Sequence, residues 1–479
     1  MNALLQNKLN IFLYISILFV LLLIIIYTAI NKTVLSRKEP KGIESDFNCG
    51  IEKLLRRYRV SGAAVAIIRE GKVVCLKCYG FSDKRKKVAM DQNTVFQVAS
   101  ISKSLTAWGV MKLWQNGLID LDAPVEKYLT RWRFEGSKYD SSGITVRRIL
   151  SHTAGLSIHG YAGYSPDKRL PTIEQSLSGN GTFNRKLAIV TQPGKKYKYS
   201  GGGFTLLQLL IEEITGMTFE NYMKKEILNP LGMNSSFYAL KDDQKSKVAK
   251  AYDVLGNEIP NYIFIEQAAA GLYTTLEDMT KFLQANIAMD NDVLHLNTRN
   301  TMFTPITDGY GLGYATDKLS NGDRVVSHLG INRGWCSHFA ILPEKRDGII
   351  ILTNSDNGYN IIFDIMNIWI EWKTGKKLPA FAYMQIKRSI TLSIAAILAI
   401  CAVIYSGVLL VSMLNHEHFM PIAIELPAIL VILALWWGTF YGKIIKGWYL
   451  AQFIPSGFDW ISFAFTIWCL IIVLQNIFL

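Results

Sequence analysis

The sequence predicts one α/β domain with membrane-spanning segments at both ends of the chain. Three observations support this class: strand-like runs at both ends of the central region, helical patterns between them, and long apolar runs outside it. They divide the 479 residues into an N-terminal anchor (1–31), a linker (32–50), a globular domain (51–380) and three further spans (386–479).

The strand signals lie at the two ends of the central region. The stretch AVAIIREGKVVCLKCYG (64–80) predicts two strands joined by a turn at Glu70-Gly71. Near the other end, SHFAILP (337–343) and GIIILTN (348–354) predict another pair. We therefore expect the first and last strands of the domain to share one sheet.

Helical patterns fill the region between these strands. One begins at Ser100 and stops at Gly117, and another runs through LLQLLIEEITG (206–216), which also ends on a glycine. An amphipathic segment, IIFDIMNIWIEW (361–372), follows the last strand pair. These segments are expected to supply helices inserted between the strands.

Four apolar runs lie outside the globular part. The first, IFLYISILFVLLLIIIYTAI (11–30), has the length of a bilayer crossing and no charge, and three more follow at 389–413, 422–441 and 458–479. A cleaved signal peptide is the alternative for the first run. Its apolar core is long for a signal, and a good small-x-small cleavage site is missing at its end. We predict an uncleaved anchor and a multi-pass protein in contact with the lipid bilayer.

The charge distribution bears on partners and on topology. The formal charge is +13, but no basic block with interleaved aromatics appears, so nucleic-acid binding is not expected. Basic residues concentrate on the domain side of the spans. The positive-inside rule, applied alone, would therefore place the domain in the cytoplasm. Large domains translocate largely regardless of such charges, so we expect an extracytoplasmic domain. The flanking residues are Lys32, Arg37, Lys38, Lys41, Lys387 and Arg388, against Lys8 alone before the first span.

The cysteines and histidines do not predict a metal site or a disulfide framework. Cys75 and Cys78 form a C-x-x-C within a predicted strand, where positions three apart face opposite sides. No second Cys or His pair with zinc spacing accompanies them. The group His416-Glu417-His418 fits a solvated loop between spans. No metal and no cofactor are expected.

A candidate nucleophile lies in VFQVASISKSLTAW (95–108). Ser100 opens a helix, where unpaired N–H groups and the positive end of the dipole favour an oxyanion. Lys103 lies one turn further on the same face, and apolar neighbours push it toward its neutral, basic form. The alternative is an N-cap serine. A second Ser-x-x-Lys, from Ser165 to Lys168, is a chance match in a polar loop.

Two later stretches add further candidates. In PGKKYKYSGGGF (193–204), Tyr199 precedes a glycine run and a helix, and a nearby cation such as Lys103 would lower its pKa. The alternative is a turn tyrosine in water. In VVSHLGINRGW (325–335), Gly330 would let a substrate backbone approach a strand edge, and the N–H of Ile331 is a candidate second oxyanion donor.

Ser-x-x-Lys, then Tyr-Ser-x, then His-x-Gly, in this order, resembles the serine β-lactamase-related family, which includes class C β-lactamases, penicillin-binding proteins and D-alanyl-D-alanine peptidases. The resemblance covers nearly the whole globular part and implies a β-lactamase/transpeptidase-like antiparallel sheet flanked by helices, with a helical insert. Further stretches that look like family landmarks are NGLIDLDAPVEKYL (116–129), ITVRRILSHTAGL (144–156), ILNPLGMNSSFY (227–238), AAAGLYTTLEDMTKFL (268–283) and YGLGY (310–314).

The resemblance implies roles for the candidates. Ser100 would attack a carbonyl and form an acyl-enzyme, and Lys103 and Tyr199 would share the proton transfers. The N–H groups of Ser100 and Ile331 would form the oxyanion hole. His328 would stand where many relatives have the lysine of Lys-Thr-Gly. In SHTAGL, His152 would have a structural role near the site.

Two departures from the family pattern narrow the expected substrate. Gly201 takes the third place of the Tyr-x-Asn element, so an amide of the substrate cleft is missing, and His328 weakens a fixed positive charge. Both weigh against an efficient β-lactamase and leave a peptidase or an esterase acting on a small peptide, amide or ester. A penicillin-type sensor that does not turn over is the alternative from another class.

The layout of a catalytic domain followed by three spans, with PSGFDW (455–460) before the last, resembles membrane-bound peptidases that remove an acylated D-asparagine cap from antibiotic or toxin precursors. The resemblance implies that the protein is located in a bacterial cell membrane. The sequence leaves the substrate and the oligomeric state open.

Overall fold

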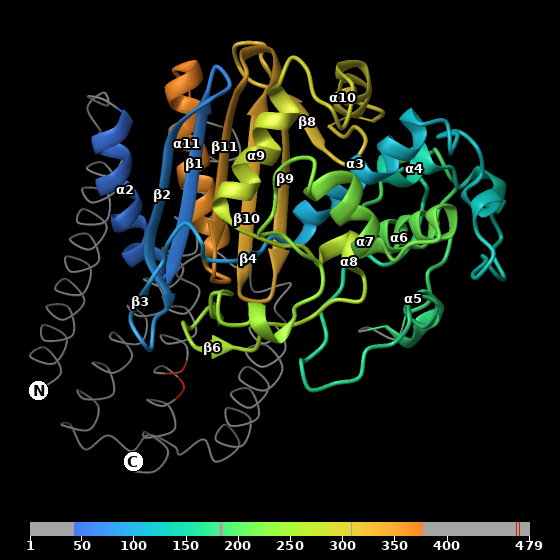
Figure 1. The fold of residues 1–479 in the computed structure, drawn as a ribbon, viewed down its shortest axis with the longest axis horizontal. Helices are drawn as coiled ribbons and strands as arrows, with labels where there is room; N and C mark the ends of the chain where they lie inside the picture. Colours follow the sequence, from blue (N-terminus) through green and yellow to red (C-terminus); the bar gives the residue numbers. More distant parts are fainter. Residues whose placement is uncertain (1–42, 182–184, 308, 377–465, 467–468, 470–479) are drawn as a thin grey trace, which may run out of the picture. The chain divides into compact units, whose positions relative to one another are not determined.

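The principal sheet of the computed structural model runs in the order β3-β2-β1-β11-β10-β9-β8, with every neighbouring pair antiparallel (Figure 1). The structure describes residues 43–181, 185–307 and 309–376, together with 466 and 469. The strands of this sheet are β1 (Gly62–Arg69), β2 (Lys72–Asp83), β3 (Val88–Ala89), β8 (Ala315–Lys318), β9 (Arg324–Asn332), β10 (Trp335–Leu342) and β11 (Asp347–Thr353).

The first and last long strands of the domain lie side by side at the middle of this sheet. β1 pairs with β11 from Ala63 opposite Thr353 to Ile68 opposite Gly348, which confirms the predicted shared sheet. The predicted hairpin is also confirmed. Glu70 and Gly71 both have positive φ, 51° and 81°, as the tight turn between β1 and β2 requires. Every residue of β11 is buried, so these strands form the core of the sheet.

Helices cover both faces of the sheet (Figure 1). α9 (Leu276–Ile287) packs on one face and α11 (Gly358–Thr374), which contains the predicted amphipathic segment, on the other. α2 (Ile43–Tyr58) begins inside the segment 32–50, so the predicted linker is wrong over its last residues. Helical spacing explains why this stretch folds: its buried side chains are Ile51, Leu54, Leu55 and Tyr58.

A helical region lies beside the β8 edge of the sheet and contains the helices predicted in the middle of the chain (Figure 1). α3 (Ser102–Gln115) is buried on nearly all sides. α6 (Gly201–Thr215) starts before the expected 206–216 and ends, as predicted, at Gly216, whose φ of 67° closes the helix. The other helices are α4 (Val146–Leu150), α5 (Ile173–Gln175), α7 (Phe219–Met223), α8 (Gln267–Ala270) and α10 (Leu296–Phe303).

Short elements complete the described fold. Two small sheets pair β4 (Phe96–Gln97) with β7 (Tyr273–Thr274) and β5 (Ala251–Tyr252) with β6 (Glu258–Ile259). The short helical turns are η1 (Ala99–Ile101), η2 (Val125–Tyr128), η3 (Ser141–Gly143), η4 (Ser176–Asn180), η5 (Lys224–Leu228), η6 (Asp242–Gln244) and η7 (Pro343–Lys345).

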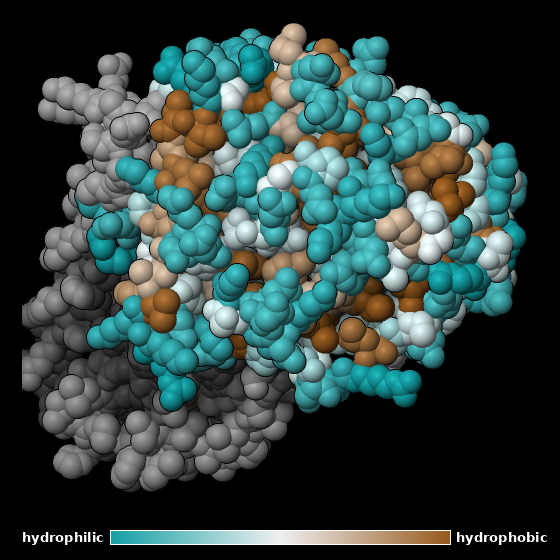
Figure 2. Space-filling view, viewed as in Figure 1, coloured by the Kyte–Doolittle hydropathy of each residue, from teal (hydrophilic) through white to brown (hydrophobic). Residues whose placement is uncertain are grey.

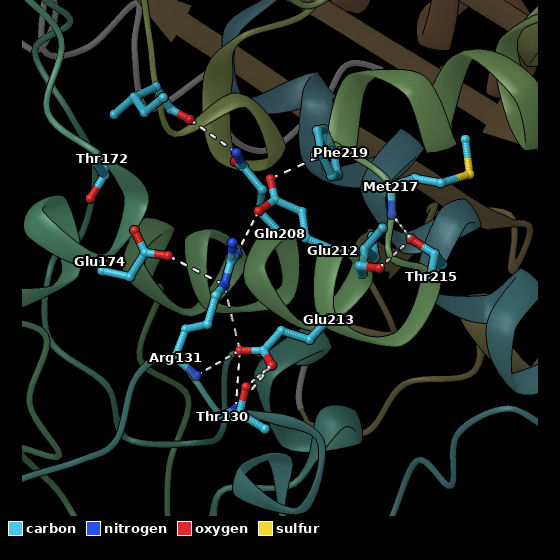
Figure 3. Close-up of polar contacts among 12 residues, drawn as sticks. Thr130, Arg131, Thr172, Glu174, Gln208, Glu212, Glu213, Thr215, Met217 and Phe219 are labelled. Carbon is cyan, nitrogen blue, oxygen red and sulfur yellow. Dashed lines mark hydrogen bonds and ion pairs between the residues drawn. The ribbon is translucent and has the colours of Figure 1, made fainter.

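A cluster of charges fixes α6 to the segment that follows η2 (Figure 3). The Glu213 carboxylate accepts the N–H groups of Thr130 (3.0 Å) and Arg131 (2.9 Å) and the Thr130 hydroxyl (2.5 Å). Arg131 reaches back to Glu212 at 2.6 Å and to Glu174 of α5 at 3.3 Å. The Glu213 side chain is 9% exposed, and its three hydrogen bonds lie at the protein surface.

Glu213→Ala is expected to lower the free energy of unfolding by about 1–3 kcal/mol, because two backbone N–H groups lose their acceptor. Urea denaturation of the purified chain measures this change. Glu135→Ala is the control, since the Glu135 carboxylate is 76% exposed and pairs only with Lys186 among the described residues. Equal midpoints for the two variants would contradict the prediction.

The residues from Cys49 to Lys377 form one compact unit. Within the described part of this unit, no helix has the length and apolar character needed to cross a membrane. The four predicted spans lie outside the described residues, apart from the isolated positions 466 and 469. On the visible face of the unit, hydrophilic side chains predominate and apolar ones form small separate groups (Figure 2).

Candidate active site

The turn that carries Ser100 is η1, which leads directly into α3. Ala99 has a φ of 50°, a left-handed conformation that is uncommon outside glycine and recurs at functional sites. The N–H of Ile101 closes the turn on the carbonyl of Val98 at 3.1 Å. Ser100 therefore lies at the positive end of the helix, as expected. The α-helix itself starts two residues later than predicted.

Lys103 approaches Ser100 from inside the protein. Its Nζ lies 3.1 Å from Ser100 Oγ and donates to the Ala269 carbonyl at 2.6 Å. The residue is 1% exposed, and within the described structure no carboxylate pairs with it. Burial lowers the pKa of Lys103 from 10.5 to about 7, the direction predicted from its apolar neighbours. The neutral amine is therefore well populated at physiological pH and faces a hydroxyl.

Tyr199 lies against the same amine. Lys103 Nζ is 5.1 Å from the centroid of the Tyr199 ring, and this ring also contacts the rings of His152 (4.2 Å between centroids) and His159 (4.7 Å). The next residue, Ser200, donates its N–H to His152 Nδ1 at 3.1 Å and caps α6 with its hydroxyl. The predicted proximity of Tyr199 to Lys103 is present in the structure.

Both buried histidines of the site are neutral. His328 Nδ1 donates to the Leu329 carbonyl at 2.8 Å, so Nε2 accepts the Tyr310 hydroxyl at 3.0 Å. Burial, and then the nearby Lys103 charge, lower the pKa of His328 to about 3. The same causes hold the pKa of His152 well below 6.5. His328 thus supplies no fixed positive charge. The sequence led us to expect a weakened charge at this position, and the structure indicates none.

Gly201 does not face an open cleft. Its N–H donates to the His159 carbonyl at 3.0 Å, and a Cβ added there would lie 3.0 Å from the same oxygen and 3.3 Å from Gly160 Cα. The chain's own loop therefore occupies the space beside this position. The missing side chain at Gly201 accommodates this loop, and a role of Gly201 in the substrate cleft stays a prediction.

The N–H of Ile331 points toward the open edge of β9. The two-residue turn at Arg333-Gly334 makes Asn332 and Trp335 the closing hydrogen-bonded pair, so the preceding pair leaves Ile331 N–H directed away from β10. On that side, β8 pairs only with 324–327 of β9. Within the described structure, the residues of β9 from His328 onward have no strand partner on that side, so an oxyanion or an extended substrate could be bound there.

Gly330 holds this edge close to the nucleophile turn. A Cβ at Gly330 would lie 2.1 Å from the Val98 carbonyl oxygen and 2.5 Å from Ser337 Oγ, and Ser337 itself donates to Val98 at 2.9 Å. A close approach at Gly330 is therefore made by the chain's own backbone next to Ser100, and contact of Gly330 with a substrate stays a prediction.

Gly330→Ala is expected to move β9 away from η1 and to lower kcat by about 10²–10³-fold, because the Ile331 N–H leaves its position. Overpacking should also cost about 1–3 kcal/mol of stability. Steady-state kinetics and thermal unfolding measure the two effects. Gly50→Ala is the control, since a Cβ there meets nothing within 4 Å. Native-like activity in the Gly330 variant would contradict the assignment.

The remaining residues singled out in the sequence make none of the contacts described for Ser100 and Lys103. Ser165 is in a loop and hydrogen-bonds the Asp167 carboxylate, as expected for a chance Ser-x-x-Lys match. Cys75 and Cys78 are free thiols on β2. Among the described residues, no group of three or more His, Cys, Asp or Glu side chains could hold a metal ion.

Three site residues were not assigned from the sequence: the Ala269 carbonyl, Tyr310 and His159. The stretches AAAGLY and YGLGY marked the first two only as landmarks, because a hydrogen bond from Lys103 or to His328 leaves no local pattern. His159 lies in a loop with no periodic signal, next to Ile158, whose φ of 58° is unusual for a β-branched residue.

Comparison with known proteins agrees with this geometry. Protein flp of Staphylococcus aureus (strain N315) is 24% identical over 322 residues, which cover 64% of this chain and 62% of that protein. Penicillin-binding protein 4* of Bacillus subtilis (strain 168) is 24% identical over 328 residues, 64% of this chain and 70% of that protein. The chain thus matches about three-fifths of the length of Protein flp.

Solved structures share the fold. The octameric penicillin-binding protein homologue from Pyrococcus abyssi superposes with a TM-score of 0.61 at 27% identity, covering 71% of this chain and 80% of that one. The β-lactamase/D-alanine carboxypeptidase from Pseudomonas syringae gives a TM-score of 0.57 at 20% identity, covering 68% and 98%. The family model described as Beta-lactamase matches residues 50–361, the region that contains every element of the site. The chain therefore belongs to the beta-lactamase family.

Proposed function

We propose that this chain is a membrane-anchored serine hydrolase that forms an acyl-enzyme on Ser100 and cleaves an amide bond next to a D-amino acid. The observation that carries the proposal is the 3.1 Å contact between the buried amine of Lys103 and Ser100 Oγ. A neutral amine at this distance can take the hydroxyl proton while the oxygen attacks a carbonyl carbon.

The steps of acylation and deacylation use the groups that surround Ser100. Ser100 Oγ bonds to the carbonyl carbon, its proton passes to Lys103, and the N–H groups of Ser100 and Ile331 stabilise the oxyanion. When the C–N bond breaks, the leaving amine takes the proton from Lys103, with the Tyr199 hydroxyl as a relay. Water then attacks the ester, and the same groups return a proton to Ser100 Oγ as the acid product leaves.

The charge of the site supports a peptidase. Because His328 is neutral, no cation at that position favours a carboxylate on the leaving group, as a β-lactam or a C-terminal D-alanine would carry. Similar proteins include a penicillin-binding protein and a β-lactamase/D-alanine carboxypeptidase, which supports a D-amino acid on the acyl side. Removal of an acylated D-amino acid cap from a precursor agrees with a neutral His328 and with a D-amino acid on the acyl side. An esterase uses the same residues and is the second candidate.

Membrane anchoring is part of the proposal. The apolar runs at 11–30, 389–413, 422–441 and 458–479 would hold the domain at the outer side of a bacterial cell membrane. Reporter fusions inside 414–421 and after Leu479 test this topology. Cytoplasmic reporter activity at either point supports an extracytoplasmic domain. Reporter activity outside the cell at both points would refute this topology.

Labelling with a fluorescent fluorophosphonate tests the hydrolase directly. Membranes with the native chain and with Ser165→Ala are expected to label, and membranes with Ser100→Ala are not. A burst of acylation without turnover of D-aminoacyl amides would favour a penicillin-type sensor over a hydrolase. A folded native chain that does not label would contradict the proposal.

A further inference from the structure

Arg333 is a cation without an anionic partner in the described structure. It lies in the turn between β9 and β10, and its guanidinium carbon is 4.2 Å from the centroid of the Tyr262 ring. The side chain is half-buried. Among the described residues, no carboxylate pairs with it and no acceptor takes its N–H groups. A partly desolvated arginine is usually paired, so this one has donors available for a ligand.

Hydrogen bonds connect the Arg333–Tyr262 pair to residues that flank the candidate active site. The Tyr262 carbonyl accepts Gln97 Nε2 at 2.6 Å, and Gln97 Oε1 accepts Asn332 Nδ2 at 3.0 Å. Gln97 precedes the nucleophile by three positions, and Asn332 lies directly between Ile331 and the arginine. The bond between Gln97 and Asn332 is buried and the one to Tyr262 is partly buried, so they hold the guanidinium over Tyr262 at a fixed place relative to the oxyanion donors.

The direction of β9, from His328 toward the turn at Arg333, indicates which part of a bound substrate would reach Arg333. Tyr199 contacts His152, His152 contacts Tyr310, and Tyr310 donates to His328, so the proton-transfer groups lie near the His328 end of the open edge of β9. We place the leaving group at that end. Past Ile331 the edge ends at the turn, about 7 Å further along the chain. The acyl portion of a bound substrate therefore extends from the carbonyl toward the arginine.

We infer that Arg333, stacked on Tyr262, is a specificity-determining residue that binds a carboxylate on the acyl side of the substrate, at the distance of a glutamyl side chain. A guanidinium matches a carboxylate with two parallel hydrogen bonds, and the aromatic ring keeps its plane fixed. The inference rests on the proposed function and adds the substrate class: D-aminoacyl amides whose acyl part is acidic.

Two substrates that differ only in charge test the subsite: the α-p-nitroanilides of N-acetyl-D-glutamate and of N-acetyl-D-glutamine. The full-length native protein is expected to prefer the glutamate compound by about 10- to 100-fold in kcat/KM, with the difference in KM. Arg333→Gln should bring this ratio to about 1, and R333E should reverse it. Arg324→Gln, at the opposite end of β9 and paired with Glu344, is the control and should keep the native ratio.

If turnover is slow, protection of Ser100 from fluorophosphonate by the same two compounds gives the same ratio. A native ratio of 1, or one that Arg333→Gln leaves unchanged, overturns the subsite while fluorophosphonate labelling of Ser100 still supports the hydrolase. A native chain that fails to label at Ser100 overturns the proposed function, and the subsite with it. Thermal unfolding of each variant shows whether a loss of preference comes from misfolding.

Discussion

Replacing Lys103 with methionine is expected to reduce the rate of Ser100 acylation by at least about 10³-fold, because the variant keeps the shape of the core and loses the proton acceptor. The rate of fluorophosphonate labelling measures the change. Lys112→Met is the control, since Lys112 is on the same helix and also donates to a carbonyl, that of Val293 at 3.0 Å. Equal loss in both variants would point to helix damage and against a catalytic amine.

The same residue sets the pH dependence of acylation. With a pKa of about 7, Lys103 is protonated below that pH and cannot accept the Ser100 proton. The acylation rate of the native chain should therefore rise through pH 7 and level off above it. A rate that does not change between about pH 5 and 9 would contradict the assignment of Lys103 as the base.

Lys103→Met is also expected to stabilise the fold at low and neutral pH. A lysine whose pKa falls from 10.5 to about 7 on folding destabilises the native state by at most about 5 kcal/mol. Between these two values the unfolded chain holds a proton that the native chain lacks, so native stability rises with pH in this window. Below pH 7 both states are protonated, and the buried ammonium ion has its full cost.

The expected difference between the two chains is therefore largest below pH 7 and shrinks toward pH 10.5. The Ala269 carbonyl loses its donor in the variant, which offsets the gain by about 1–3 kcal/mol. Urea denaturation at several pH values measures both trends, with Lys112→Met as the control for losing any lysine of α3. Parallel stability curves for the native chain and Lys103→Met would show that Lys103 keeps an ordinary pKa in the native state.

Local patterns predicted the parts of the fold that depend on neighbouring residues. Alternation and the Glu70-Gly71 turn gave the first hairpin, and helical spacing gave α3 and the end of α6. The pairing of Ser100 with Lys103 could be predicted for the same reason, because positions three apart on a helix lie on one face.

Contacts between distant segments could not be predicted in this way. The Val98 carbonyl excludes a side chain at Gly330, and the His159 loop fills the space beside Gly201. The Tyr310 hydroxyl donates to His328 Nε2, and burial lowers the pKa of this imidazole. Each of these depends on how two elements far apart in sequence meet. The start of α2 was missed because its first turns contain polar residues and a glycine.

The pairing of β1 with β11 has a consequence for how the protein is made. β1 pairs with β2 directly, but almost the whole domain must leave the ribosome before β1 can pair with β11. β9 and β10, which shape the oxyanion side of the site, come just before β11. Such high contact order slows folding and leaves early strands exposed during synthesis. A nascent chain that carries Ser100 and Lys103 therefore lacks the β9–β10 side of the candidate site until translation has passed these strands.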